Sequence, residues 1–342
     1  MSQFWMIPVA LAVSFCLTAA LRRYALARSL LDIPNARSSH SIPTPRGGGV
    51  AVVLTFLLML LALRRLELIS PSLFLALMGA GAGVAVIGFL DDHGHIAARW
   101  RLLGHFLAAG WALYWLGGMP VLPVFGISVD LGVLGTLVGL VFLVWMLNLY
   151  NFMDGIDGIA GVQAVTACFS ACLLYGLNGY PSELWVPLFL ALAVCGFLCW
   201  NFPPARIFMG DAGSGFLGIV LGVLSLHAAS FAAELFWCWL VLLGVFVVDA
   251  TATLLRRLVR GDKVYEAHRT HAYQYASRHY GRHLPVTLAV ALINVFWLLP
   301  IAVLCAQTAL NGVWAVLLAY APLVALALRF HAGKRETNAR ER

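Results

Sequence analysis

Three short stretches of the sequence combine aspartate with glycine at the ends of apolar segments: GFLDDHG, NFMDGIDG and FMGDAGSG. Carboxylates are ligands that hard divalent cations prefer, and Mg²⁺ usually shares its coordination shell with substrate phosphates. Glycine lets backbone N–H groups approach a phosphate closely. Each stretch alone also fits a plainer interpretation: solvated helix-end charges, a flexible turn, or close helix packing by small residues. Together they indicate cation-assisted phosphate chemistry.

The rest of the chain predicts a membrane protein. It has 342 residues, of which 62% are hydrophobic and 11% charged, and its mean hydropathy is +0.89. A helix needs about 20 apolar residues to cross a bilayer. About eleven segments meet that need: 3–21, 47–63, 72–90, 102–118, 131–150, 159–177, 184–200, 213–229, 235–255, 286–306 and 312–329. We therefore predict an all-α polytopic membrane protein.

The distribution of basic residues predicts the orientation. If the N-terminus is periplasmic, the loops after odd-numbered segments and the C-terminal tail are cytoplasmic, and they hold 20 of the 22 Lys and Arg. The chain is then a single integral membrane domain over 1–342. Its cytoplasmic parts are the loops at about 22–46, 91–101, 151–158, 201–212 and 256–285 and the tail 330–342. The +7 charge reflects topology rather than nucleic-acid binding. Because no basic region precedes the first segment, we expect it to stay uncleaved.

This topology brings all three aspartate motifs to the cytoplasmic face, where they could form one site. Asp91 and Asp92 are adjacent on a helix end and cannot point the same way, which suggests different roles. Asp154 and Asp157 lie three residues apart and share a face if the stretch is helical. A calcium loop is the competing interpretation, but the twelve-residue pattern is not completed.

Basic side chains accompany the aspartates. RSSHSIPTPRGGG offers Arg37, His40 and Arg46, and EAHRTHAYQ offers His268, Arg269 and His271. His268 and His271 could together bind a metal, but their basic neighbours favour phosphate contact.

Two further features lie inside the apolar segments. Asp249 is costly within a membrane helix, so it is either functional or hydrogen-bonded to a threonine or a neighbouring helix. The seven cysteines all fall within apolar segments without metal-binding spacing, which is typical of buried apolar residues.

This constellation suits phosphoryl transfer between a soluble diphosphate and a lipid phosphate, with Mg²⁺ neutralising charge on the transferring group. An ion-coupled transporter is the alternative, but its site should lie near the bilayer midplane, often between two related halves. A phosphotransferase with a CDP-linked donor is a second alternative, and its pattern continues DGxxAR, whereas Asp157 precedes GIAGVQ.

At residues 30–280 the chain resembles the polyprenyl-phosphate N-acetylhexosamine-1-phosphate transferases of glycosyltransferase family 4, relatives of the phospho-MurNAc-pentapeptide translocase. The motifs that carry the resemblance, in order, are SIPTPRGGG, GFLDDHG, NLYNFMDGIDG, NFPPARIFMGDAGSG and EAHRTHAYQ. The resemblance implies transfer of a sugar 1-phosphate from a UDP-N-acetylhexosamine to undecaprenyl phosphate, with release of UMP. It implies Mg²⁺, with Mn²⁺ as a substitute, and a multi-pass place in the bacterial inner membrane. A homodimer is left open.

The resemblance also implies roles for individual residues. Asp211 is the direct metal ligand, and Asp92 supports the metal. Asp91 is the candidate base for the lipid phosphate. The catalytic set is Asp91, Asp92, Asp154, His268 and His271. The substrate-binding set is Asp157, Asn201, Phe208, Asn151, Arg46, Arg99, Arg101 and Arg269, in which Phe208 is available to stack on uracil. The glycines of NFMDGIDGIAG, Gly155 among them, are expected to leave room for the nucleotide.

The chain departs from the pentapeptide translocase pattern at two places. His95 stands where that branch has a lysine, so phosphate contact is expected from Arg99 or Arg101 instead, and HRTHA replaces a triple histidine. These differences point to the O-antigen-initiating branch without identifying the sugar. The resemblance allows direct attack by the lipid phosphate or a covalent intermediate on an aspartate, and we favour direct attack.

Overall fold

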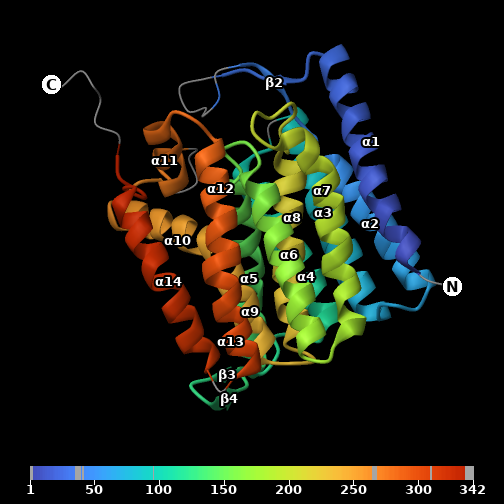
Figure 1. Ribbon diagram of the computed structural model, residues 1–342, viewed down its shortest axis with the longest axis vertical. Helices are drawn as coiled ribbons and strands as arrows, with labels where there is room; N and C mark the ends of the chain where they lie inside the picture. Colours follow the sequence, from blue (N-terminus) through green and yellow to red (C-terminus); the bar gives the residue numbers. More distant parts are fainter. Residues whose placement is uncertain are drawn as a thin grey trace.

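The helices of the protein form an elongated bundle (Figure 1). The computed structural model describes residues 3–34, 40, 42–94, 96–263, 268–308 and 310–335. Three features discussed above, Arg37, His95 and the tail from 336 onward, lie outside these residues.

The α-helices are α1 (Met6–Ala27), α2 (Gly49–Arg65), α3 (Pro71–His93), α4 (Ala98–Leu116), α5 (Gly132–Phe152), α6 (Ile159–Leu177), α7 (Trp185–Asn201), α8 (Asp211–Ala228), α9 (Glu234–Leu242), α10 (Gly244–Val259), α11 (Ala272–Tyr280), α12 (Leu284–Ile293), α13 (Leu299–Gln307) and α14 (Gly312–Arg329). Short 3₁₀ helices η1 (Gln3–Trp5) and η2 (Pro181–Leu184) precede α1 and α7, and a π-helical turn η3 (Asn294–Leu298) joins α12 to α13. Two antiparallel ribbons pair β1 (Leu31–Asp32) with β2 (Thr44–Pro45) and β3 (Leu122–Val124) with β4 (Ile127–Val129).

Each of the eleven predicted segments is largely helical. Within the described residues, eight helices are long and apolar enough to cross a membrane, or nine if the bent pair α9–α10 counts as one span. α2 has only 17 residues, and α4 carries Arg99, Arg101 and His105. The polytopic helical architecture is therefore confirmed, whereas the count of eleven and the orientation stay predictions.

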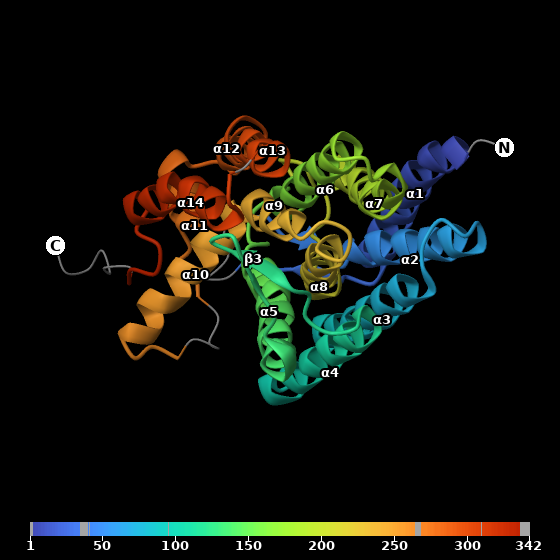
Figure 2. The same cartoon turned by 90° about the horizontal axis from the view of Figure 1, so that it is seen from below.

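One predicted span has a different shape. The segment 235–255 is not straight, because the chain bends by 72° between α9 and α10. In Figure 2, α10 leaves the bundle sideways. The predicted loop at 256–285 likewise contains the end of α10 and all of α11. Asp249 therefore lies on a helix that turns away from the bundle rather than within a straight span.

The core of the bundle is α8, which lies in its middle in Figure 2, and 89% of its apolar stretch is buried. Its glycines permit the close packing that small residues provide in membranes. A Cβ atom added at Gly213 would lie 2.6 Å from the Cα of Gly49 on α2, and one added at Gly218 would lie 2.7 Å from the Cα of Leu147 on α5. α8 thus brings the ends of α2, α3 and α5 together at its own N-terminus.

We call the end of the bundle that carries β1–β2 and α11 the site end, and the opposite one the β3–β4 end. In Figure 1 they are the top and the bottom. The aspartate motifs lie at the C-terminal ends of α3 and α5 and at the N-terminus of α8, so all three meet at the site end.

Candidate active site

Asp92 and Asp211 connect the first and third motifs. The Asp92 carboxylate accepts hydrogen bonds from the backbone N–H groups of Asp211 and Ala212, both at 3.3 Å. These N–H groups belong to the first turn of α8 and have no intrahelical acceptor, so Asp92 caps that helix. Gly210, at φ +79°, makes this approach possible, because a Cβ there would lie 2.8 Å from Asp92 Oδ2. The Arg46 guanidinium donates to the backbone carbonyl of Asp92.

Asp211 keeps part of its carboxylate open. Its Oδ1 accepts a hydrogen bond of 3.0 Å from Asn151, which also donates to Ser214 at 2.9 Å. Its Oδ2 lies 3.6 Å from the Arg101 guanidinium, and 40% of the side chain is exposed. Asp211 can therefore bind a further partner from the cavity beside it.

Asp91 faces the other way, toward α4. Its carboxylate pairs with Arg101 and accepts the Ile96 N–H at 2.9 Å, and the side chain is 8% exposed. Arg101 thus joins Asp91 to Asp211. The two adjacent aspartates have different surroundings, as their positions on a helix require.

The second motif forms a turn rather than a helix, so Asp154 and Asp157 do not share a helical face. Asp157 Oδ1 lies 3.0 Å from His283 Nδ1, and Oδ2 accepts the Ala205 N–H at 3.0 Å. Burial alone would raise the pKa of Asp157, but the hydrogen bonds from His283 and Ala205 hold it below its usual value.

Asp154 has the opposite electrostatic environment. Burial, and then the neighbouring carboxylates, raise the pKa of Asp154 well above its usual value. Those carboxylates belong to Asp211, Asp92 and Asp157. Like charges held this close favour a proton or a cation between them.

Two cavities open at these residues. The first, of about 240 Å³, is lined among others by Asp32, His40, Arg46, Asp92, Asn151, Asp154, Asp157, Asn201, Phe208, Asp211, Gln274 and His283. The second, of about 150 Å³, is more apolar and is lined among others by Ile87, Asp91, Arg101, Leu102, His105, Leu147, Asn148, Asn151 and Asp211. Asn151 and Asp211 belong to both, so they stand between the two spaces.

Phe208 and Asn201, both predicted to contact the nucleotide, differ in how exposed their side chains are. Phe208 is half-buried, lies edge-on to His40 with ring centroids 4.8 Å apart, and is fixed by a backbone hydrogen bond of 2.8 Å to Pro45. Asn201 is buried, and its amide bridges the Gly158 N–H and the Ile207 carbonyl at 3.0 and 2.9 Å. Asn201 therefore holds the walls of the cavity that it lines.

Four residues that were predicted for the site line neither cavity: Arg99, His268, Arg269 and His271. Arg99 packs over the Trp100 ring at 5.6 Å and lines neither cavity. His268 stacks on His271, with ring centroids 4.9 Å apart, and His271 is 3% exposed. Neither they nor Arg269 line the two cavities.

Sequence reasoning missed Gln274 and His283. Gln274 stands at the end of the quoted AHRTHAYQ stretch, so its motif was visible but its role was not. His283 precedes α12 in a segment that was expected to be a loop, and only the fold brings it to Asp157.

The donor set fits Mg²⁺ of the kind that binds substrate phosphates. Within the described part of the chain, no group of three or more His, Cys, Asp or Glu side chains is arranged to hold a metal. Mg²⁺ does not require such a cage, since it retains waters and takes one or two carboxylates plus phosphate oxygens. The exposed Asp211 carboxylate beside Asp154 matches that need.

The pKa of Asp157 has a consequence for stability. Because its folded pKa lies below the unfolded value of about 3.9, Asp157 stabilises the fold above that pH, and the contribution is lost as the pH falls through the folded pKa. We expect the melting temperature of the purified protein to fall more steeply between about pH 5 and pH 3 than that of Asp157→Asn. Thermal unfolding in detergent at stepped pH measures this, and parallel curves would contradict it.

The chain is similar to known proteins in the region that carries the aspartate motifs. The family model "Glycosyl transferase family 4" matches residues 73–229, from α3 to the end of α8. An undecaprenyl-phosphate alpha-N-acetylglucosaminyl 1-phosphate transferase of Thermotoga maritima is 29% identical over 84% of this chain and 86% of its own. A probable undecaprenyl-phosphate N-acetylglucosaminyl 1-phosphate transferase of Bacillus subtilis is 26% identical over 88% and 84%.

A relative with a different name is also similar over part of the chain. A phospho-N-acetylmuramoyl-pentapeptide-transferase of Streptococcus thermophilus is 28% identical over 52% of this chain and 56% of its own. The matched segment contains the three aspartate motifs and the helices that bring them together. Residues 73–229 therefore match glycosyltransferase family 4, and the chain is similar to proteins named as undecaprenyl-phosphate N-acetylglucosaminyl 1-phosphate transferases and phospho-N-acetylmuramoyl-pentapeptide-transferases.

Proposed function

We propose that this protein transfers an N-acetylhexosamine 1-phosphate from a UDP-sugar to undecaprenyl phosphate, which releases UMP and forms an undecaprenyl-diphosphate sugar. We place this reaction at the cytoplasmic face of the bacterial inner membrane, as the first membrane step of O-antigen or related envelope polysaccharide synthesis. The relatives' names support the reaction class. The observation that carries the proposal is the position of Asp211 between a polar and a more apolar cavity.

The first cavity suits the nucleotide sugar. Phe208 offers a ring for stacking on uracil. Arg46 lines the same space and can face the diphosphate, while Asp157 and Asn201 fix the walls through backbone hydrogen bonds.

The second cavity suits the phosphate end of a lipid. Apolar side chains from α3, α4 and α5 line it beside Asp91 and Arg101. Arg101 is placed to neutralise charge on an incoming phosphate, and Asp91 is the candidate proton acceptor.

We infer that the lipid phosphate oxygen attacks the β-phosphorus of the donor directly. The new bond joins the lipid phosphate to the sugar phosphate, and the bond to UMP breaks. Mg²⁺ held by Asp211, with Asp92 and Asp154 in support, would stabilise negative charge on the phosphates. Asn151 orients the Asp211 carboxylate for that task.

A chase experiment tests the direct route. Enzyme is incubated with UDP-sugar radiolabelled in the β-phosphate and without lipid, then denatured. We expect no label on the protein. A labelled aspartate would show a covalent intermediate and overturn direct attack.

Activity on a donor panel tests the function itself. Purified protein is incubated with undecaprenyl phosphate, Mg²⁺ and a set of UDP-N-acetylhexosamines. We expect UMP release that requires the lipid and stops on chelation. UMP release that does not depend on the lipid would contradict the proposed function.

The transporter alternative is less well supported by the geometry. The aspartates gather at one end of the bundle, at the helix ends, whereas a coupled transporter keeps its site near the midplane.

A further inference from the structure

Asp249 is a buried carboxylate that the mechanism above does not use. It is 6% exposed and lies in α10, after the bend. Its Oδ1 accepts the backbone N–H of Ala272, and its Oδ2 accepts that of Tyr273, both at 2.9 Å. These two residues open α11, and their N–H groups have no acceptor within that helix. Asp249 therefore caps α11 from another helix.

Two more groups surround the same carboxylate. Thr253 donates a hydrogen bond of 3.2 Å to Asp249 Oδ1, and His271 Nδ1 lies 3.4 Å from that oxygen. The Gln274 side chain in turn accepts the His271 backbone N–H at 3.3 Å. The residue before α11 and its first turn are thus held in one arrangement around Asp249.

The first turn of α11 rests on the NFMDGIDG turn. The Tyr273 hydroxyl donates a hydrogen bond of 3.0 Å to the Phe152 carbonyl, at the end of α5. A Cβ added at Gly155 would lie 2.2 Å from that hydroxyl. The absent side chain of Gly155 therefore leaves room for Tyr273, whereas the sequence suggested room for the nucleotide. Gln274, next along α11, lines the first cavity.

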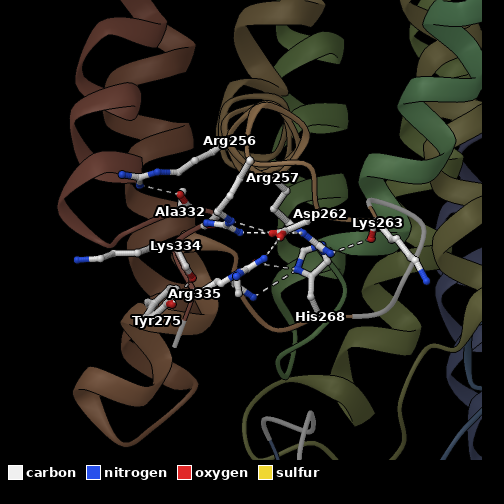
Figure 3. Close-up of polar contacts among 12 residues, drawn as sticks. Arg256, Arg257, Asp262, Lys263, His268, Tyr275, Ala332, Lys334 and Arg335 are labelled. Carbon is white, nitrogen blue, oxygen red and sulfur yellow. Dashed lines mark hydrogen bonds and ion pairs between the residues drawn. The ribbon is translucent and has the colours of Figure 1, made fainter. Parts of the chain in front are cut away.

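The C-terminal segment holds α11 from the other side. The Gly333 N–H donates to the Thr270 carbonyl at 2.7 Å, and Tyr275 donates to the Lys334 carbonyl at 2.6 Å. Figure 3 shows this segment, with Ala332, Lys334 and Arg335, lying between Arg256 and Tyr275. None of these residues lines either cavity. α11 is thus fixed on its outer side by the C-terminal segment and at its N-terminus by Asp249.

We propose that Asp249 is a positioning residue, whose carboxylate fixes the N-terminus of α11 so that Gln274 lines the donor cavity and Tyr273 supports the NFMDGIDG turn beside it. The identity of the donor rests on the proposed function, but the position of α11 does not. A buried aspartate that served only its own helix would find all its hydrogen-bond partners in α10. Asp249 instead places both oxygens on the backbone of α11.

Asp249→Asn tests this with a small change of shape. The amide nitrogen cannot accept a hydrogen bond, so one of the two N–H groups loses its acceptor. We expect faster hydrogen–deuterium exchange in the peptide 268–280, with exchange in α6 and α7 unchanged. We also expect the KM for the UDP-sugar to rise about tenfold, while the KM for undecaprenyl phosphate stays at the wild-type value.

The matched control is Gln163→Leu. Gln163 is also buried, and its amide donates to the Leu242 carbonyl at 2.9 Å and accepts from Asn294 at 3.0 Å, away from both cavities. Its loss removes buried hydrogen bonds without touching α11, so the donor KM and the exchange at 268–280 should stay unchanged. An equal rise of donor KM in this control would mean that Asp249 contributes only general stability.

A second variant covers the case in which Asp249→Asn does not fold. Tyr273→Phe removes only the hydrogen bond by which α11 contacts the Phe152 carbonyl at the end of α5. It should also raise the donor KM. Unchanged exchange at 268–280 in Asp249→Asn, or an unchanged donor KM in Tyr273→Phe, would overturn the proposal. If the wild-type protein transfers no sugar phosphate, the proposed function fails, but the exchange measurement still decides the position of α11.

Discussion

Asp211→Asn is expected to lower lipid-dependent UMP release by about 10³-fold. The asparagine keeps the size of the side chain and one acceptor oxygen, so the hydrogen bond from Asn151 can persist. It loses the negative charge that stands between the two cavities and that Mg²⁺ would need. The melting temperature should change little or rise, because removal of one of several crowded carboxylates relieves repulsion. The measurement is UMP release under saturating donor and lipid, with thermal unfolding in parallel.

Asp130→Asn is the matched control for that variant. Asp130 is exposed at the β3–β4 end and accepts the Gly132 N–H at 2.9 Å, a bond that asparagine can also make. This variant should keep wild-type activity. Activity of Asp211→Asn within about tenfold of wild type would contradict a direct metal role for Asp211, because a lost ligand carboxylate costs more than that.

The sequence predicted the place of the site better than its internal contacts. Topology alone brought Asp91, Asp154 and Asp211 to one end, because each motif follows an odd-numbered apolar segment. It could not show that Asp92 caps α8 or that Arg101 joins Asp91 to Asp211, since these contacts depend on how α3, α4 and α8 cross.

The bend between α9 and α10 was missed for a physical reason. A continuous apolar run is compatible with a straight span and with a bent one, so hydropathy does not distinguish the two. The signal that could have shown it was Asp249, with Arg256 and Arg257 directly after the same segment. Its carboxylate reaches the backbone N–H groups of α11 because α10 turns toward the chain that follows.

The histidines show the same limit. The resemblance placed His268 and His271 near the diphosphate, and the structure puts them beside Phe152, outside both cavities. Gln274 occupies the cavity wall in their stead. Spacing along a loop does not determine which side chain faces inward once the loop is anchored by a distant residue.

Gly88→Ala is expected to reduce activity about 100-fold, because displacement of a catalytic group by about 1 Å can cost that much. Gly88 lies in α3, one turn before Asp92, and an added Cβ would lie 2.6 Å from the Asp211 carbonyl and from the Ala212 nitrogen. These are backbone atoms of α8, which cannot rotate away as a side chain can. The methyl group must push the N-terminus of α8 off α3 and so break the hydrogen bonds from Asp211 and Ala212 to Asp92. Overpacking of this kind also costs about 1–3 kcal/mol of stability.

Gly83→Ala separates this effect from a change in helix propensity. Gly83 lies in the same helix, and an added Cβ there meets no atom within 4 Å. Both variants gain about 1 kcal/mol of intrinsic helix propensity, so only the contact with α8 distinguishes them. UMP release and melting temperature measured side by side should show Gly83→Ala at or above wild type and Gly88→Ala below it in both. Equal activity of the two variants would mean that the spacing between α3 and α8 does not set the geometry of Asp92 and Asp211.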